Sequence, residues 1–148
     1  MSPLPSKCPA RVLLVEDNEA DVRLTREALR EAVEDVRLSA VGDGEQAMRY
    51  LRREGGFADA PRPDLVLLDL NLPRKNGLEV LDEMQADRSL ASIPVIVLTS
   101  SAARQDVEAC YAHGANAFVV KPLELDAFMD LIGAIRGFWL GVAQLPSA

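Results

Sequence analysis

The sequence has 148 residues, a formal net charge of −7 and 49% hydrophobic residues, which suits one folded domain with a single core. The negative charge and the lack of a basic stripe argue against direct nucleic-acid binding, which needs several lysines or arginines to neutralise phosphates. No stretch approaches the about 20 apolar residues of a membrane span, and the start lacks the apolar core of a signal peptide, so we expect a cytoplasmic protein that does not bind membranes.

The predicted secondary-structure elements alternate between strands and helices along the chain. Short runs of Val, Ile and Leu bounded by polar residues predict strands, and apolar residues at helical spacing predict helices. The predicted strands are 12–15, 36–41, 65–68, 95–98 and 118–120, and the predicted helices start after the N-cap Asn18 and cover 45–53, 77–85, 104–113 and 123 to about 140. Strands this apolar are typical of a parallel sheet covered by helices on both faces. The sequence therefore predicts an α/β fold of five βα units.

Polar residues follow four of the predicted strands directly. They are Glu16 and Asp17 after the first strand, Asp69 with Asn71 after the third, Thr99 and Ser100 after the fourth, and Lys121 and Pro122 after the fifth. Ligands and chemistry gather outside the carboxyl ends of the strands in such a sheet. We therefore expect three acids, a hydroxyl and an amine to meet in one crevice.

This conjunction of four fragments, each after its own strand, resembles the receiver domain of response regulators over roughly residues 11–136. Receivers accept a phosphoryl group from a histidine kinase onto an aspartate. The resemblance implies a flavodoxin-like, doubly wound sheet of five parallel strands in the order 2-1-3-4-5. It also implies a receiver over residues 11–140 between tails at 1–10 and 141–148, and the residues after Lys121 are too few for a separate output domain.

The resemblance assigns the acids to phosphoryl transfer and metal binding. Asp69 matches the phosphoacceptor of the family. Asp17 and Asp69 would bind Mg²⁺ directly, Asn71 through its backbone carbonyl and Glu16 through a water molecule, with Mn²⁺ as an alternative metal. Mg²⁺ requires octahedral oxygen ligation, which one or two carboxylates, a carbonyl and a phosphate can provide. Clustered carboxylates repel one another unless a cation compensates, which favours a metal site over a structural role.

The other site residues match positions that bind or sense the phosphoryl group. Lys121 would pair with the phosphoacceptor and place its amine on a phosphoryl oxygen, and a cis peptide before Pro122 would aim that amine inward. Thr99 and its neighbour Ser100 would offer hydroxyls to the phosphoryl group after transfer. Phe118 matches the aromatic switch position, whose side chain would rotate into the space that Thr99 leaves.

Two segments indicate a subgroup of receivers: a loop at 55–63 that is rich in Gly and Pro, and the C-terminal segment. Together with residues 70–77, they are similar to receivers that partner phytochromes and related histidine kinases. The implied partner is a sensor histidine kinase, with a bacteriophytochrome as the candidate. Phe138, Trp139 and Leu140 are too apolar for a solvated tail, so they either cover the domain's own core or meet a second chain. Because aromatic residues anchor interfaces, we favour a homodimer.

Three other functions compete with that of a phosphorylated signalling protein. A degenerate receiver that acts as a constitutive interaction module would lack one of the site residues, and all are present. Aspartyl-phosphate hydrolases carry Asp-x-Asp, whereas Asn71 stands two residues after Asp69, and there is no room for a cap domain. Flavin binding needs a phosphate-cradling loop after the first strand, where residues 16–19 are largely acidic. We therefore predict a signalling protein that is not an enzyme, apart from self-catalysed phosphorylation and dephosphorylation of its aspartate.

Overall fold

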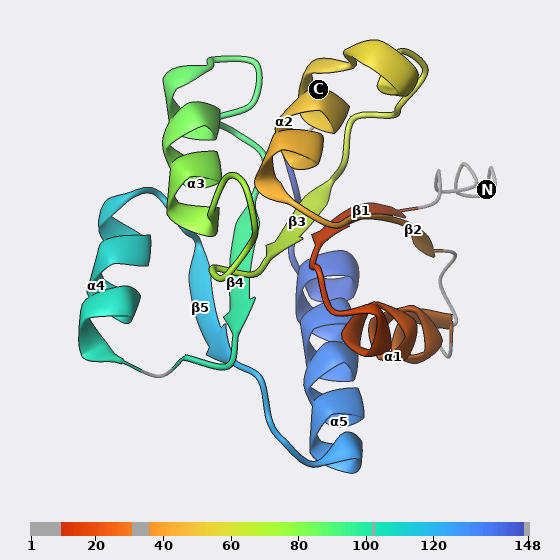
Figure 1. The fold of residues 1–148 in the computed structure, drawn as a ribbon. Coiled ribbons are helices and arrows are strands. Elements are labelled where there is room, and N and C mark those ends of the chain that lie inside the picture. Colours follow the sequence, from red (N-terminus) through yellow and green to blue (C-terminus); the bar gives the residue numbers. More distant parts are fainter. Residues whose placement is uncertain (1–9, 31–35, 102, 147–148) are drawn as a thin grey trace, which may run out of the picture.

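The computed structural model describes residues 10–30, 36–101 and 103–146. Five parallel strands form one sheet in the predicted order β2-β1-β3-β4-β5 (Figure 1). The strands are β1 (Ala10–Val15), β2 (Val36–Val41), β3 (Leu65–Leu68), β4 (Val95–Thr99) and β5 (Ala117–Val120). The helices are α1 (Glu19–Arg30), α2 (Gly44–Arg52), α3 (Gly77–Ala86), α4 (Arg104–Ala112) and α5 (Leu125–Ile135). Residues 1–9 and 147–148 of the predicted tails lie outside the described ranges.

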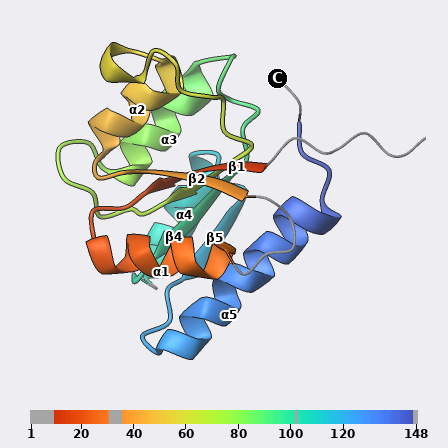
Figure 2. The same ribbon diagram turned by 90° about the vertical axis from the view of Figure 1, so that its right-hand side faces the viewer.

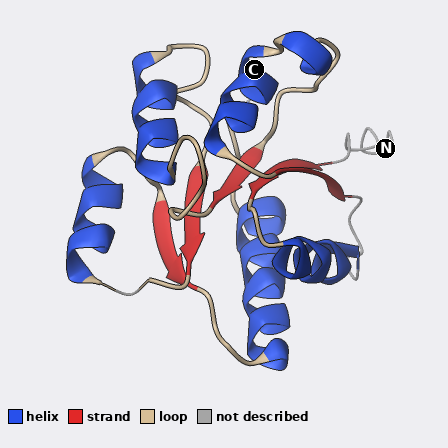
Figure 3. Ribbon diagram, viewed as in Figure 1, coloured by secondary structure: helices blue, strands red, loops and turns tan. Residues whose placement is uncertain are grey.

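Helices cover both faces of the sheet, so the molecule has three layers (Figures 2 and 3). Side chains alternate along each strand and supply two cores. The core beneath α2, α3 and α4 receives Leu13, Val15, Val66, Leu68, Val95 and Val97 from the strands. The core beneath α1 and α5 receives Val12, Leu14, Leu65, Leu67, Ile96 and Leu98. Burial on both faces explains why the strands are continuous apolar runs.

Local sequence signals set where the helices begin. The side chain of Asp43 caps α2 by accepting a hydrogen bond from the backbone N of Gln46 (2.8 Å). Asn76 and Glu79 form a capping box at the start of α3. The boundaries of α2 and α3 therefore lie within one residue of the predicted ones, and so do those of α4, which has no side-chain cap. In the described ranges, no helix has both the length and the apolar character that a membrane span requires.

The last helix, predicted from 123 to about 140, begins two residues later and changes type before its end. Helix α5 covers Leu125–Ile135, and the chain continues as a π-helical turn over Arg136–Val142. Gly137 and Gly141 fall within this turn, and glycine weakens an α-helix because it loses more backbone entropy than other residues. The terminal aromatic residues therefore project from a wider turn than the predicted helix implied.

The start of α3 lies directly against the backbone that follows β3. Gly77 N donates a hydrogen bond to Leu70 O (3.0 Å), and a Cβ on Gly77 would lie 2.5 Å from the backbone oxygen of Asp69. A residue with a side chain cannot approach this closely without moving the backbone. Gly77 therefore sets the distance between α3 and the strand end that carries Asp69.

We expect Gly77→Ala to destabilise the fold, although alanine is the better helix former. The added methyl group would push the backbone of Asp69 away from α3, at a cost of about 1–3 kcal/mol. Gly133→Ala in α5 is the matched control, because nothing lies within 4 Å of its Cβ position. There the same change should stabilise by about 0.4–1 kcal/mol. Urea unfolding of both variants measures the two free energies, and equal effects would contradict a close approach at Gly77.

Candidate functional site

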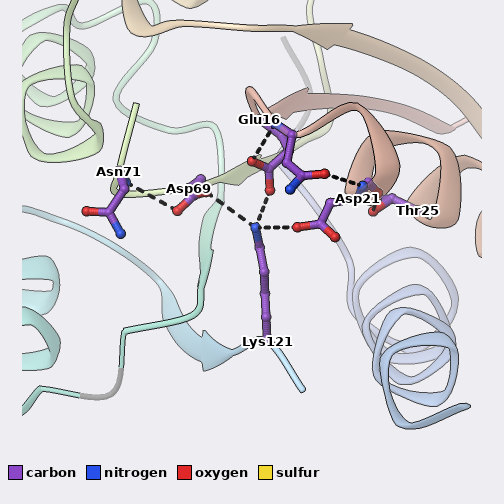
Figure 4. Close-up of polar contacts among 7 residues, drawn as sticks. Glu16, Asp21, Thr25, Asp69, Asn71 and Lys121 are labelled. Atoms are coloured by element: carbon purple, nitrogen blue, oxygen red, sulfur yellow. Dashed lines mark hydrogen bonds and ion pairs between the residues drawn. The ribbon is translucent and has the colours of Figure 1, made fainter. Parts of the chain in front are cut away.

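The carboxyl ends of the strands deliver the predicted site residues to one edge of the sheet. Three of these residues extend the sheet by a backbone hydrogen bond: Glu16 N donates to Val41 O (3.0 Å), Asp69 N to Val15 O (3.1 Å) and Lys121 N to Thr99 O (2.8 Å). Because the strands run in the same direction, these bonds place the three side chains next to one another (Figure 4). The structure thus brings Glu16, Asp69 and Lys121 together.

The ammonium group of Lys121 lies among three carboxylates. Its Nζ donates to Glu16 Oε1, to Asp21 Oδ2 (3.0 Å) and to Asp69 Oδ2 (3.3 Å) (Figure 4). The side chains of Lys121 and Asp69 are each 10% exposed, so water screens these charges little. Burial disfavours the charged amine, but the hydrogen bond and charge of Glu16 and the charge of Asp69 outweigh burial and raise the pKa of Lys121. Lys121 is therefore a cation at neutral pH.

Burial acts on Glu16 in the opposite sense. It raises the pKa of Glu16 to about 7, and the hydrogen bond and charge of Lys121 offset this increase only in part. The nearby charge of Asp69 raises the pKa further. Burial thus works against the ionised form of Glu16, and a cation bound beside it would favour that form.

The carboxylates of Glu16, Asp17 and Asp69 form a cluster that fits a divalent cation. One oxygen from each lies within 4.8 Å of the other two. Glu16 and Asp69 are buried, whereas Asp17 is exposed and leaves the cluster accessible from solvent. A donor set made only of anionic oxygens suits Mg²⁺ or Mn²⁺ better than a metal that prefers sulfur or imidazole. The residues present therefore fit the predicted cofactor.

Asn71 lies beside this cluster in the loop after β3. Its backbone N donates to Asp69 Oδ1 (3.2 Å), which orients the carboxylate (Figure 4). An open cavity of about 510 Å³ runs from Asp17 along this loop, past Asn71 and Asn76, to Asp106 on α4. The site can therefore be approached from solvent on this side. The role of the Asn71 carbonyl as a metal ligand stays a prediction.

Thr99 ends β4 with a fully buried side chain. Among the described residues, its Oγ1 has no hydrogen-bond partner. A buried hydroxyl without a partner costs about 1–3 kcal/mol, so an acceptor that reached Thr99 would recover this energy. A phosphoryl oxygen is such an acceptor. Binding of a phosphoryl group by Thr99 and by its exposed neighbour Ser100 stays a prediction.

Phe118 on β5 is partly buried and packs against the core beneath α2, α3 and α4. Its backbone N donates to the hydroxyl of Tyr111 on α4 (3.1 Å), a contact that sequence analysis missed. This bond ties α4 to an edge strand of the sheet. No sequence pattern signals it, because Tyr111 and Phe118 belong to different elements. The predicted switch role of Phe118 is untested.

Asp21, the third carboxylate on Lys121, was not among the residues predicted from the sequence. Asp21 lies in the first turn of α1, and its backbone N donates a hydrogen bond to Asn18 Oδ1 (3.1 Å). Thr25 Oγ1 donates to the backbone oxygen of Asp21 one turn later (2.7 Å). Its position in the sequence was a usable signal. Helix α1 begins at the site, and an acidic side chain in the first turn of such a helix can point back toward the site.

The predicted cis peptide before Pro122 is not found. Among the described residues every peptide bond is trans, including the one between Lys121 and Pro122. The trans form is intrinsically preferred by about 0.5–1 kcal/mol even before proline. The hydrogen bond from Lys121 N to Thr99 O already directs the lysine toward the carboxylates. An inward-pointing amine therefore does not require the cis form.

The structure divides the three predicted dimer residues. Trp139 and Leu140 are partly buried and pack against the core beneath α1 and α5. Phe138 is 54% exposed, and its ring meets that of Trp139 edge to face, with centroids 5.5 Å apart. Val142 in the same turn is 78% exposed. Two of the three residues thus cover the domain's own core, and Phe138 is the most exposed of the three.

Known proteins are similar to this chain in both sequence and fold. Residues 12–133 match the response regulator receiver domain. The chain is 42% identical over 143 residues to response regulator Rcp1 of Synechocystis sp., covering 97% of each. It is similar to the crystal structure of the phosphorylated cyanobacterial phytochrome response regulator RcpA, with a TM-score of 0.92 and 44% identity over 95% of this chain and all (100%) of RcpA. The Mn²⁺-bound form of Rcp1 gives a TM-score of 0.90 and 42% identity over 94% of this chain and 100% of that one. The chain therefore belongs to the response regulator receiver family.

Proposed function

We propose that Asp69 is the phosphoacceptor of this receiver and that Asp17, Asp69 and the backbone carbonyl of Asn71 bind Mg²⁺, with Glu16 acting through a water molecule. The observation that carries this proposal is the environment of Asp69. Its carboxylate is buried, pairs with Lys121 and clusters with two further carboxylates. Such a cluster costs folding energy unless a cation compensates it, so a purely structural role explains it poorly.

In the proposed reaction, a phosphohistidine of the donor becomes an acyl phosphate on Asp69. A carboxylate oxygen of Asp69 bonds to phosphorus while the P–N bond to the donor imidazole breaks. The bonding electrons return to the imidazole, which takes up a proton from solvent. Because the nucleophile and the phosphoryl oxygens are all anionic, Mg²⁺ held by Asp17, Asp69 and the Asn71 carbonyl would supply most of the charge neutralisation. Lys121 adds to it by shifting its hydrogen bond from Asp69 to a phosphoryl oxygen.

The acyl phosphate would then act on a surface through Thr99 and Phe118. We propose that the unpartnered hydroxyl of Thr99 moves to donate to a phosphoryl oxygen, assisted by Ser100. The space that Thr99 leaves admits the ring of Phe118. Because Tyr111 ties β5 to α4, this rotation alters the surface formed by α4, β5 and α5. Formation and hydrolysis of the acyl phosphate are catalysed by the receiver's own residues.

The proposed donor is a sensor histidine kinase, which must bring its phosphohistidine within bonding distance of Asp69. The loop between β5 and α5 follows Lys121 directly and exposes Leu123 completely (103%), and Leu125, the first residue of α5, is 54% exposed. Exposed leucines beside a reaction site favour contact with a protein partner. The similarity to the phytochrome regulator RcpA supports a bacteriophytochrome as the kinase. We place this signalling in the cytoplasm, because ATP, the phosphoryl donor of histidine kinases, is available there.

We expect acetyl phosphate with Mg²⁺ to add one phosphoryl group, and Asp69→Asn to abolish this addition because the nucleophile is lost. Removal of Mg²⁺ with EDTA should abolish it as well. Asp130→Asn, the same change at an exposed position of α5, is the control and should be labelled normally. Intact-mass measurement gives the result. Full labelling of Asp69→Asn at another residue would disprove the assignment.

Leu123→Ser should slow phosphorylation by the kinase without slowing phosphorylation by acetyl phosphate. The leucine contacts only a protein donor in our proposal, and loss of a buried leucine at an interface costs about 1–3 kcal/mol. Val142→Ser removes an equally apolar, exposed side chain elsewhere and serves as control. Radiolabel transfer from the autophosphorylated kinase measures the rate. Equal slowing with both donors would show that Leu123 supports the site and not the docking.

We further propose that the receiver forms a homodimer through Phe138. The side chain is 54% exposed, and exposed Val142 in the same turn extends its apolar surface. Trp139 supports the Phe138 ring edge to face, which holds the anchor in a fixed orientation. An aromatic anchor of this kind is typical of the centre of an interface.

Phe138→Ser should weaken this dimer and leave the melting temperature of the monomer unchanged, because Trp139 and Leu140 still cover the core. Loss of an aromatic anchor typically costs about 2 kcal/mol or more of binding energy. Sedimentation velocity over a range of concentrations measures the association, with Leu123→Ser as an exposed control. If the original chain is monomeric and Phe138→Ser melts earlier, the ring serves only its own domain.

A further inference from the structure

One carboxylate ties the loop between β3 and α3, residues 69–76, to two helices. Lys75 in the loop donates its Nζ to Oε2 of Glu83 on α3. Arg52, the last residue of α2, places its Nη2 at 3.4 Å from Oε1 of the same Glu83. Both oxygens of Glu83 are thus engaged by cations from different elements. The loop, α2 and α3 are therefore joined at one point.

These ion pairs are shielded from water more than an ordinary surface pair. The side chains of Lys75 and Glu83 are 24% and 30% exposed. The Arg104–Glu108 pair on α4, by comparison, is 91% and 72% exposed. Fully exposed pairs contribute little because water and salt screen them. The network around Glu83 can therefore restrain the loop more strongly than its surface position suggests.

The backbone at Lys75 needs such a restraint. Arg74 has a φ of 67°, in the left-handed region, and Lys75 N donates to Pro73 O (2.7 Å), which makes a tight γ-type turn. A non-glycine residue in this conformation costs about 1–3 kcal/mol and persists where its surroundings hold it. The surroundings are close, because a Cβ on Gly44 of α2 would lie 2.0 Å from Lys75 O.

The restrained loop begins at the proposed metal site. Asn71 N donates to Asp69 Oδ1 (3.2 Å), and Gly77 N closes the loop by donating to Leu70 O (3.0 Å). Few residues separate Lys75 from Asn71. This short connection is the route by which the turn at Lys75 can act on the backbone of Asn71.

We propose that Lys75 and Glu83 are positioning residues, which set the affinity of the receiver for its divalent cation through the backbone of Asn71. Arg52 contributes by holding Glu83 in place. This inference rests on the metal role proposed above for Asp17, Asp69 and Asn71. It adds three side chains, Lys75, Glu83 and Arg52, outside the proposed set of metal ligands.

Charge and position predict different signs for the same variants. As plain charges, Lys75 repels a cation at the site and Glu83 attracts it, so Lys75→Met would strengthen metal binding and Glu83→Gln would weaken it. As positioning residues, both free the loop when changed, and both variants bind metal more weakly. The double variant should bind no more weakly than either single one, because both changes remove the same interaction.

Calorimetric titration of the full chain with Mn²⁺ measures these affinities. We expect the Kd to rise about tenfold in Lys75→Met and in Glu83→Gln, the lower end of what loss of a partner around a metal ligand costs. Lys75→Arg keeps the cation and should bind as the original chain does. Glu108→Gln removes an exposed ion pair and is the matched control. In the metal-free protein, the amide NMR resonance of Asn71 should shift only in the two weakened variants.

Opposite signs for the two single variants, or unchanged affinity in both, would overturn the positioning role. Glu83→Gln is nearly isosteric, so it carries the test if Lys75→Met does not fold. Asp17→Ala distinguishes the two levels of the proposal. If Asp17→Ala binds Mn²⁺ normally, the proposed metal site is wrong. If it loses the metal while the Lys75 and Glu83 variants keep it, the site stands and only the positioning role fails.

Discussion

The charge balance around Lys121 is the constraint on which the site depends. Three carboxylates contact one amine, and exposed Asp17 adds a fourth negative charge nearby. Loss of one partner from such a buried group leaves an uncompensated charge, at a cost of about 3–5 kcal/mol. Lys121 therefore allows the acids to stay together before any ligand arrives. The remaining negative charge attracts a divalent cation to the site. A bound cation would in turn reduce the repulsion between the carboxylates and an anionic phosphoryl group.

The parallel sheet is what brings these charges together. Lys121 and Glu16 are 105 residues apart in the sequence, yet they sit at the ends of β5 and β1 in one sheet. Apolar side chains on both faces of every central strand hold the strand ends in register. The same strand register therefore determines both the packing of the core and the geometry of the site. Any change in register would separate the carboxylates from the amine.

Two parts of the chain modify this common scheme. The loop after β3 contains a left-handed residue, Arg74, and is held by ion pairs to α2 and α3 through Glu83. The segment after α5 folds as a π-helical turn that covers the core with Trp139 and Leu140 and presents Phe138 outward. In our proposals, the loop after β3 sets the strength of metal binding, and the segment after α5 forms the contact between two copies of the receiver. Neither changes the order of the strands or the placement of Asp69.

Apolar runs and the polar residues that follow them are local signals, so the strands and the site residues at their ends could be predicted from the sequence. The order of the strands followed from the resemblance to receivers. Glu16, Asp69 and Lys121 could be found in this way. Two differences from expectation have local causes. The trans form of the bond before Pro122 is intrinsically preferred, and Gly137 and Gly141 weaken the α-helix after Ile135. Asp21 left only a weak signal, its place in the first turn of α1, and the Glu83 network left none. Their partners come from other elements, so which side chains meet depends on the packing of the whole domain.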